Sequence, residues 1–210
     1  ALRSDIRRLG EMLGETLVRQ EGPDLLDLVE QVRSLSKEMR VSPDEGQRHL
    51  DDLLDRLDVD TAIRLVRAFT TYFHLANVAE QVHRLDPGTT RSSRGDRTLA
   101  GVVDRILEAG IDPERIADVT ARLEVRPVLT AHPTEAARRS ILTKLTAIAD
   151  LLEQRGDPRA TAAEQAALDG RIAEVIEVLW QTDELRRTRP TPLDEVRTSI
   201  YYLEGLASDA

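Results

Sequence analysis

Apolar residues recur at three- and four-residue spacing along most of the chain, which is the period of amphipathic helices. One stripe of apolar residues ends before Gly22-Pro23, and a second runs from Leu25 to Met39. Ser42-Pro43-Asp44-Glu45 has the sequence of a capping box and predicts the start of a third helix. Between Asp60 and Arg84, apolar residues fall on most sides of one long segment. This predicts a helix that is buried among others.

The pattern changes after this long segment. Residues 86–97 are polar and contain Gly and Ser, which predicts a mobile loop. Residues 98–123 keep the helical period and predict two short helices, whereas residues 124–131 lose it and predict one short strand. Because a lone strand cannot form a sheet, we expect its partner strands outside this chain. The 210 residues are therefore expected to be a portion of a longer protein.

The last part of the chain, residues 132–208, predicts long helices. Pro133 fits the first position of a helix that runs to about Gln154. A further helix is expected from Thr161 to Thr188, and Thr191 is expected to cap the last one. The fold class predicted for residues 1–210 is therefore mainly α, in a single portion made of helices (1–85), a loop (86–97), short helices (98–123), a strand (124–131) and long helices (132–208).

The amino-acid composition restricts the classes of molecule that the chain is expected to bind. The net charge is −9, from 29 basic and 38 acidic residues, which argues against binding to nucleic acid or to an anionic membrane. The chain has no cysteine, so it has neither a thiolate nucleophile nor a cysteine-ligated metal, and it suits a reducing cytosol. No apolar run approaches the roughly 20 residues that a membrane-spanning helix needs.

The most informative chemistry lies where the predicted strand meets the next helix. His132 precedes Pro133 and is expected at the helix N-terminus, where unpaired N–H groups and a partial positive charge favour anions. Arg138 and Arg139 add two permanent cations within the next two turns. Because positive potential disfavours the protonated imidazole, His132 is expected to stay neutral and to accept a proton. This arrangement predicts acid–base chemistry on a phosphorylated or carboxylated substrate.

Other interpretations of the histidines stay open. A histidine before a proline is commonly a surface or capping residue, and His132 fits that role as well. His49 lies in a charged segment and is expected to face solvent, whereas His74 and His83 lie on the long apolar segment and are expected in the core. No histidine and carboxylate pair has the spacing of metal ligands, and no glycine-rich phosphate loop occurs.

A second candidate segment runs from Leu179 to Pro190 and holds the single tryptophan, Trp180, followed by three arginines in four residues. Trp180 is either part of the wall of a ligand site or an ordinary core residue. The arginines, with Asp183 and Glu184 nearby, are either a binding cluster or a salt-bridged helix face.

Four stretches of the sequence resemble the phosphoenolpyruvate carboxylase family of bacterial type. Val128–Ser140 (VLTAHPTEAARRS) is similar to the family's histidine motif, and Leu179–Arg197 (LWQTDELRRTRPTPLDEVR) is similar to a second motif. Leu2–Leu17 and Tyr72–Gln81 resemble two further family segments. The likeness covers nearly the whole chain and corresponds to the N-terminal portion of the family.

The resemblance implies an enzyme that forms oxaloacetate and phosphate from phosphoenolpyruvate and bicarbonate. It implies a β/α barrel wrapped in helices, a cytoplasmic homotetramer and a requirement for Mg²⁺ or Mn²⁺. His132 matches the catalytic histidine of the family, which takes a proton from carboxyphosphate. Trp180 is expected in the apolar wall near the substrate, and Arg138 and Arg139 are expected to contact substrate anions.

The departures from the family concern length. Family members are several times longer, and their metal ligands and other catalytic basic residues lie further along than this sequence extends. We therefore expect the metal to be bound by residues outside this chain, and the 210 residues alone to be inactive. Two alternatives come from other classes of protein: a helical module with a phosphorylated histidine, which Pro133 disfavours, and a helical interaction scaffold without catalysis.

Overall fold

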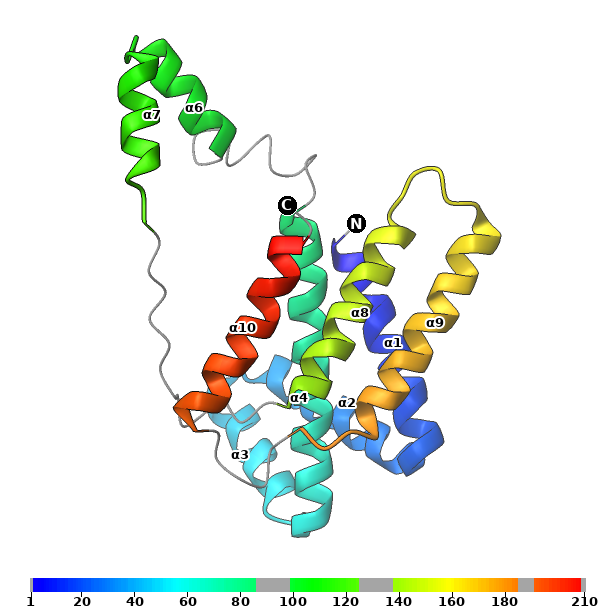
Figure 1. Ribbon diagram of the computed structural model, residues 1–210. Coiled ribbons are helices and arrows are strands. Elements are labelled where there is room, and N and C mark those ends of the chain that lie inside the picture. Colours follow the sequence, from blue (N-terminus) through cyan, green and yellow to red (C-terminus); the bar gives the residue numbers. More distant parts are fainter. Residues whose placement is uncertain (1, 86–98, 125–137, 185–190, 209–210) are drawn as a thin grey trace. The chain divides into compact units, whose positions relative to one another are not determined.

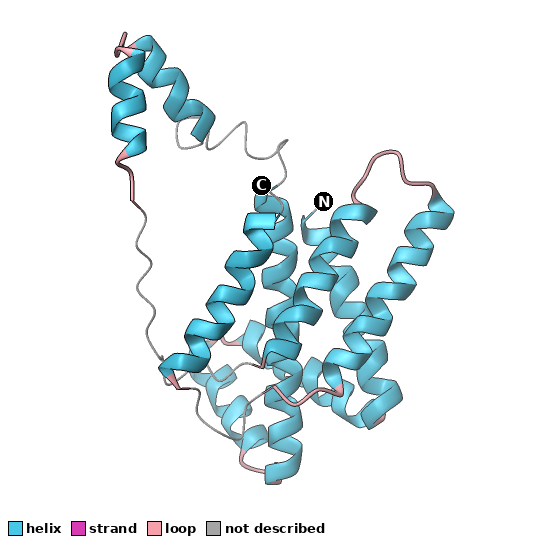
Figure 2. Cartoon of the chain, in the orientation of Figure 1, coloured by secondary structure: helices cyan, strands magenta, loops and turns pink. Residues whose placement is uncertain are grey.

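The computed structural model describes residues 2–85, 99–124, 138–184 and 191–208, and every regular element within these ranges is an α-helix (Figures 1 and 2). The predicted loop at 86–97 and residues 125–131 of the predicted strand lie outside the described ranges. Within the ranges, the mainly α prediction is confirmed. The helices are α1 (Leu2–Glu21), α2 (Pro23–Glu38), α3 (Pro43–Leu54), α4 (Val59–Leu85), α6 (Leu99–Glu108), α7 (Pro113–Ala121), α8 (Arg139–Arg155), α9 (Ala162–Trp180) and α10 (Pro192–Ser208).

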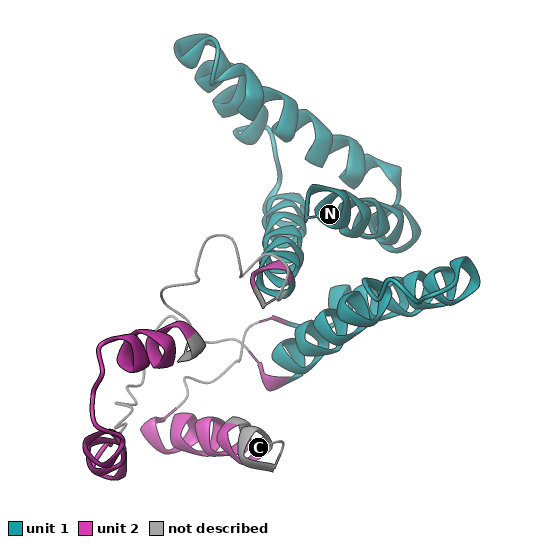
Figure 3. Ribbon diagram, turned by 90° about the horizontal axis from the view of Figure 1, so that it is seen from above, with its two compact units in different colours: residues 1–82, 140–183 teal, residues 83–139, 184–210 magenta. Residues whose placement is uncertain are grey.

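The chain forms two compact units, which are described separately (Figure 3). Unit 1 comprises Ala1–Val82 and Ser140–Asp183, and unit 2 comprises His83–Arg139 and Glu184–Ala210. In unit 2, no residue of α7 is buried, and α6 exposes Val103 and Leu107. Among the described helices, none combines the length and the apolar character needed to cross a bilayer.

The core of unit 1 lies between α1, α4, α8 and α9. Each helix contributes side chains at helical spacing, and burial of each large one stabilises the fold by roughly 1.5–3 kcal/mol. Asp169 of α9 adds a polar link, because its carboxylate accepts hydrogen bonds from Arg8 of α1 at 2.8 Å and Arg155 of α8 at 2.6 Å. The largest fully buried side chains are those of Trp180, Leu9, Leu17, Leu75, Ile148, Ile172, Ile176 and Thr16.

The predicted helix caps differ in outcome. Thr191 caps α10 as expected, since its hydroxyl accepts the Asp194 amide at 3.3 Å. At Ser42 the prediction of a capping box is wrong, because the Ser42 side chain makes no cap hydrogen bond. Ser42 instead donates its backbone N–H to the Glu38 carbonyl at 2.8 Å, which holds it in the turn that leaves α2. A complete capping box occurs at Thr161 and Glu164.

The Glu164 carboxylate is stabilised in its charged form by this box. The backbone N–H and then the hydroxyl of Thr161 donate to it, and both lower the pKa of Glu164. Because the folded pKa is depressed, this contribution to stability is present at neutral pH and is lost as the pH falls through the carboxylate range.

The long helix α4 matches the predicted Asp60–Arg84 segment to within one residue at each end. The expectation that it is enclosed on most sides is wrong within the described residues. Leu75 and Ala79 are fully buried, but Ile63, Val66 and Phe73 are 59%, 65% and 59% exposed. These three side chains lie on the faces that α1, α8 and α9 do not cover.

We expect opposite effects from adding a methyl group at two helical glycines. A Cβ at Gly46 would lie 2.6 Å from the Met39 amide nitrogen, so Gly46→Ala forces α3 away from the turn after α2. The expected loss is about 1–3 kcal/mol of the free energy of unfolding. Gly170 is an exposed residue of α9 with nothing within 4 Å of such a Cβ, so Gly170→Ala is expected to add about 0.5–1 kcal/mol. Urea denaturation of both variants measures the difference, and equal effects of the same sign would contradict the packing at Gly46.

Candidate functional site

The residues predicted for the site come from the two motif segments. His132 lies outside the described residues, whereas Arg138, Arg139 and Trp180 are described. Arg138 and Arg139 belong to unit 2, and Trp180 belongs to unit 1.

The end of the histidine motif contacts the second motif within unit 2. The backbone N–H of Arg138 donates to the backbone carbonyl of Glu184 at 3.3 Å. Arg138 is not helical, and α8 begins at Arg139. The expectation of one continuous helix from Pro133 is therefore wrong at Arg138, because its amide is bound by a carbonyl from a distant segment. This hydrogen bond brings together the two stretches that the sequence singled out.

Arg139, the first residue of α8, stacks on an aromatic ring of unit 2. Its guanidinium carbon lies 4.4 Å from the centroid of the Tyr201 ring, on α10. At a partly exposed position, such a cation–π contact contributes about 0.5–1 kcal/mol. The contact restrains the position of the Arg139 side chain beside the Tyr201 ring.

Trp180 is the last residue of α9, and its side chain is 2% exposed. The indole Nε1 donates to Glu21 Oε1 at 3.1 Å, and the Arg67 guanidinium lies 4.6 Å from the centre of the indole ring. The interpretation of Trp180 as a core residue is thus confirmed within unit 1. Its expected place in the wall of a substrate site stays a prediction.

Arg67 of α4 determines where α9 ends. Its guanidinium donates to the Trp180 carbonyl and, at 3.2 Å, to the Thr182 carbonyl. The last carbonyls of a helix lack partners within the helix and carry partial negative charge, so a cation stabilises them. The prediction that this helix continues to Thr188 is wrong for that reason. Asp183 and Glu184 follow the helix, so they cannot belong to a salt-bridged helix face.

Glu21 completes this cluster at the end of α1. Its carboxylate accepts the Trp180 indole N–H and pairs with Arg64 of α4 at 3.4 Å. The sequence analysis did not select Arg67 or Glu21. The available signal was a charged residue between Val66 and Ala68 in an otherwise apolar stretch, because a cation at such a position needs a specific partner.

The other histidines contribute no site in the described residues. His49 is exposed as expected, with its Nδ1 3.5 Å from a Glu38 carboxylate oxygen. His74 and His83 are only half-buried on α4, so the expectation that they lie in the core is wrong in degree. In the part of the chain that the structure describes, no group of three or more His, Asp or Glu side chains is placed to hold a metal ion.

Comparison with known proteins identifies the family. A family model described as phosphoenolpyruvate carboxylase matches residues 2–210. The chain belongs to the phosphoenolpyruvate carboxylase family. The resemblance inferred from the two motifs is confirmed.

Three curated relatives illustrate the match. Phosphoenolpyruvate carboxylase of Pseudomonas syringae pv. tomato is 38% identical over 206 residues, which cover 97% of this chain and 23% of the relative. That of Bradyrhizobium diazoefficiens is 38% identical over 207 residues, covering 97% and 22%, respectively. That of Actinobacillus pleuropneumoniae serotype 5b is 34% identical over 205 residues, covering 98% and 23%. The chain spans less than a quarter of the length of these phosphoenolpyruvate carboxylases.

We expect Arg67→Leu to destabilise unit 1 by about 2–4 kcal/mol, because it removes a cation–π contact and charged hydrogen bonds to two carbonyls. Arg67→Lys should recover only part of this loss, since an ammonium lacks the planar fork. Urea denaturation followed by the fluorescence of Trp180, the single tryptophan, measures both variants.

The matched control is Arg64→Leu, on the same helix. Arg64 is 45% exposed and forms an ion pair with Glu21 at 3.4 Å, so its loss should cost at most about 1 kcal/mol. Equal losses at positions 64 and 67 would contradict the special role of Arg67.

Proposed function

We propose that this chain acts as the N-terminal portion of a longer phosphoenolpyruvate carboxylase, which forms oxaloacetate and phosphate from phosphoenolpyruvate and bicarbonate. The observation that carries the proposal is the hydrogen bond between Arg138 and Glu184, because it joins the histidine motif to the second motif. The family match over residues 2–210 supports the same function.

His132 is proposed as the acid–base residue. Phosphate moves from phosphoenolpyruvate to bicarbonate, which leaves carboxyphosphate and the enolate of pyruvate. His132 takes the proton from carboxyphosphate, which then separates into carbon dioxide and phosphate, and the enolate carbon attacks carbon dioxide. A neutral imidazole next to an anion site is suited to this proton transfer.

Arg138 and Arg139 are proposed to bind the anionic groups of the substrates. Arg138 lies six positions after His132, so the cations follow the base closely in the sequence. Glu184 fixes the backbone at Arg138, and Tyr201 orients the Arg139 guanidinium. Trp180 is proposed to contribute to the apolar side of the site, where exclusion of water protects the enolate from protonation.

Mg²⁺ or Mn²⁺ is proposed to be held by residues outside residues 1–210, since the described residues offer no suitable group. The metal would supply charge stabilisation for the enolate. The assembly is proposed to be a cytoplasmic homotetramer in which further polypeptide completes a β/α barrel. Because residues 1–210 lack those parts, they are proposed to be inactive alone.

We expect His132→Asn to lower oxaloacetate formation by about 10²–10⁴-fold, which is the contribution of general acid–base catalysis. An antibody against residues 1–210 first gives the mass of the polypeptide in its source cell, expected to be several times 23.5 kDa. That polypeptide is then assayed for bicarbonate-dependent oxaloacetate formation, with and without the substitution, and circular dichroism checks the fold.

The control variant is His49→Asn, on exposed α3, which should leave the rate unchanged. A polypeptide of only 23.5 kDa would overturn the proposal. Full activity of His132→Asn would also overturn it and would leave a non-catalytic helical scaffold as the better interpretation.

Arg138→Gln and Arg139→Gln are each expected to raise KM for phosphoenolpyruvate by about tenfold or more, because each removes a charged hydrogen bond to an anion. The effect on kcat should be smaller, since both substitutions weaken ground-state binding. Arg122→Gln, at the exposed C-cap that follows α7, is the control. An unchanged KM in both variants would contradict a substrate contact.

A further inference from the structure

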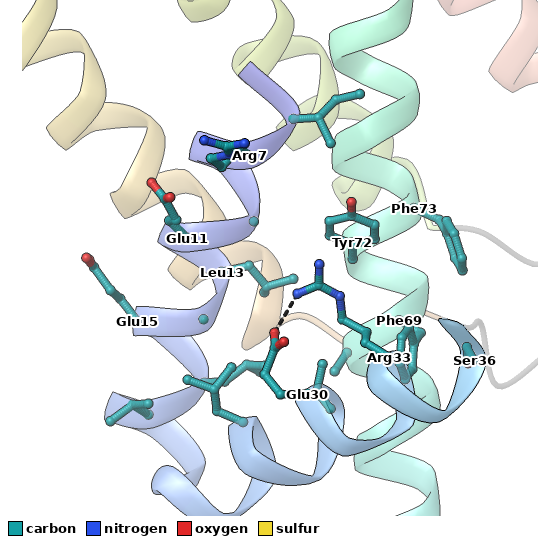
Figure 4. A pocket seen from close by; sticks show the side chains of 18 of the residues that line it. Arg7, Glu11, Leu13, Glu15, Glu30, Arg33, Ser36, Phe69, Tyr72 and Phe73 are labelled. Carbon is teal, nitrogen blue, oxygen red and sulfur yellow. Dashed lines mark hydrogen bonds and ion pairs between the residues drawn. The ribbon is translucent and has the colours of Figure 1, made fainter. Parts of the chain in front are cut away.

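A groove of about 1140 Å³ opens between α1, α2 and α4 within unit 1 (Figure 4). Its lining residues lie within Arg3–Arg19 of α1, Leu26–Arg40 of α2 and the turn after it, and Ala68–Phe73 of α4. We call this the α1–α2–α4 groove. It is separate from the cluster of Arg67, Trp180 and Glu21.

Gly10 and Gly14 of α1 have no side chains, so α1 does not fill the groove at these two positions. A Cβ at Gly10 would lie 3.4 Å from the Tyr72 ring, and one at Gly14 would lie 3.5 Å from Leu26. Without these side chains, Tyr72 reaches from α4 to the surface of α1, and Figure 4 shows its ring pointing into the groove. Phe73, beside it, is 59% exposed. The groove therefore exposes apolar aromatic surface, which is unfavourable in contact with water.

The rim of the groove is cationic although the chain is acidic. Six cations and three carboxylates line it, an excess of three positive charges in a chain of net charge −9. Arg33 pairs with Glu30 at 2.5 Å, and Arg19 pairs with Glu177 at 3.2 Å. The four other cations are exposed and form no ion pair with any described residue: Arg3, Arg7, Lys37 and Arg40.

We propose that the α1–α2–α4 groove is the docking site of an acidic segment with apolar anchors, supplied by the same polypeptide from outside residues 1–210. This rests on the proposed function, in which the chain is part of a longer enzyme. An apolar centre with a polar rim is the anatomy of a protein interface. The unpaired cations favour carboxylates in the docking segment. Tyr72 and Phe73 favour apolar side chains in it.

The length of the relatives favours a segment of the same polypeptide over a separate protein. The chain matches 23% of the Pseudomonas syringae enzyme, so about three-quarters of that relative lies outside the match. A tethered segment is present at an effective concentration of millimolar order, so a modest interface suffices for full occupancy. A single small anion would satisfy one or two cations, whereas the unpaired cations are spread over α1 and the C-terminal end of α2.

Thiol labelling tests occupancy of the groove in the longer polypeptide. Ser36 lines the groove, whereas Ser34 is another exposed serine of α2 that lies outside it, and residues 1–210 contain no native cysteine. We expect Ser36→Cys to react with a maleimide at least about tenfold more slowly than Ser34→Cys, as read by peptide mass spectrometry. A tenfold protection corresponds to about 1.4 kcal/mol of docking free energy.

Charge reversal tests the chemistry of the partner. Adding Arg7→Glu and Arg40→Glu to Ser36→Cys should bring its labelling rate to within about twofold of that of Ser34→Cys, because acidic residues would then face like charges. Protection that survives both reversals would overturn the acidic character of the segment.

Carbodiimide coupling identifies the source of the segment. Lys37 and Lys144 are the two lysines among residues 1–210, and Lys37 lies on the groove. We expect an amide between Lys37 Nζ and an Asp or Glu outside residues 1–210 of the same polypeptide. Coupling of Lys37 only to a second copy, to another protein or within residues 1–210 would overturn the proposal.

The two proposals fail in different ways. If the polypeptide has a mass of only 23.5 kDa, the proposed function fails and no tethered segment exists. If a longer polypeptide forms oxaloacetate while positions 36 and 34 label equally, only the docking proposal fails.

Discussion

The guanidinium of Arg67 makes the interaction on which the arrangement of the two motifs depends. It covers the Trp180 indole and donates to the carbonyls of Trp180 and Thr182, so α9 ends at Trp180 rather than continuing. Because the helix ends there, Glu184 is non-helical and its carbonyl accepts the Arg138 amide. A helix that continued to Thr188 would use the Glu184 carbonyl in its own hydrogen-bond ladder. The end of α9, from which the second motif continues to Glu184, therefore depends on one partly buried cation of α4.

The positive charge of Arg67 needs negative charge nearby, and unit 1 supplies it from two sources. The carbonyls at the end of α9 accept hydrogen bonds from Arg67, and the Glu21 carboxylate accepts the indole N–H of Trp180. Glu21 is also paired with Arg64, so the local charge is not one isolated anion. Polar groups at this junction are satisfied by partners from three helices, which ties α1, α4 and α9 in one relative placement.

Sequence periodicity predicted the helices well, because α1, α4, α8 and α9 each bury apolar side chains at helical spacing. It predicted helix ends poorly. Ser42 makes no side-chain cap, the amide of non-helical Arg138 is bound by a carbonyl 46 residues away, and α9 ends at Trp180, whose carbonyl is bound by a cation 113 residues away. Motif likeness selected Arg138, Arg139 and Trp180, but Arg67 and the α1–α2–α4 groove depend on side chains that converge only in three dimensions.

The charge distribution is compatible with the proposed binding of anionic substrates near an acidic chain. A net charge of −9 repels anions at long range, but screening limits that repulsion to about 8 Å at physiological ionic strength. Binding then depends on cations within that distance, which makes their local placement more important than the total. Arg138 and Arg139 follow His132 closely and are fixed by Glu184 and Tyr201, whereas the unpaired cations of the groove belong to unit 1. The two sets of cations thus belong to different units, and the proposed roles differ accordingly: Arg138 and Arg139 are proposed to bind substrate anions, and the groove cations are proposed to bind carboxylates of the polypeptide itself.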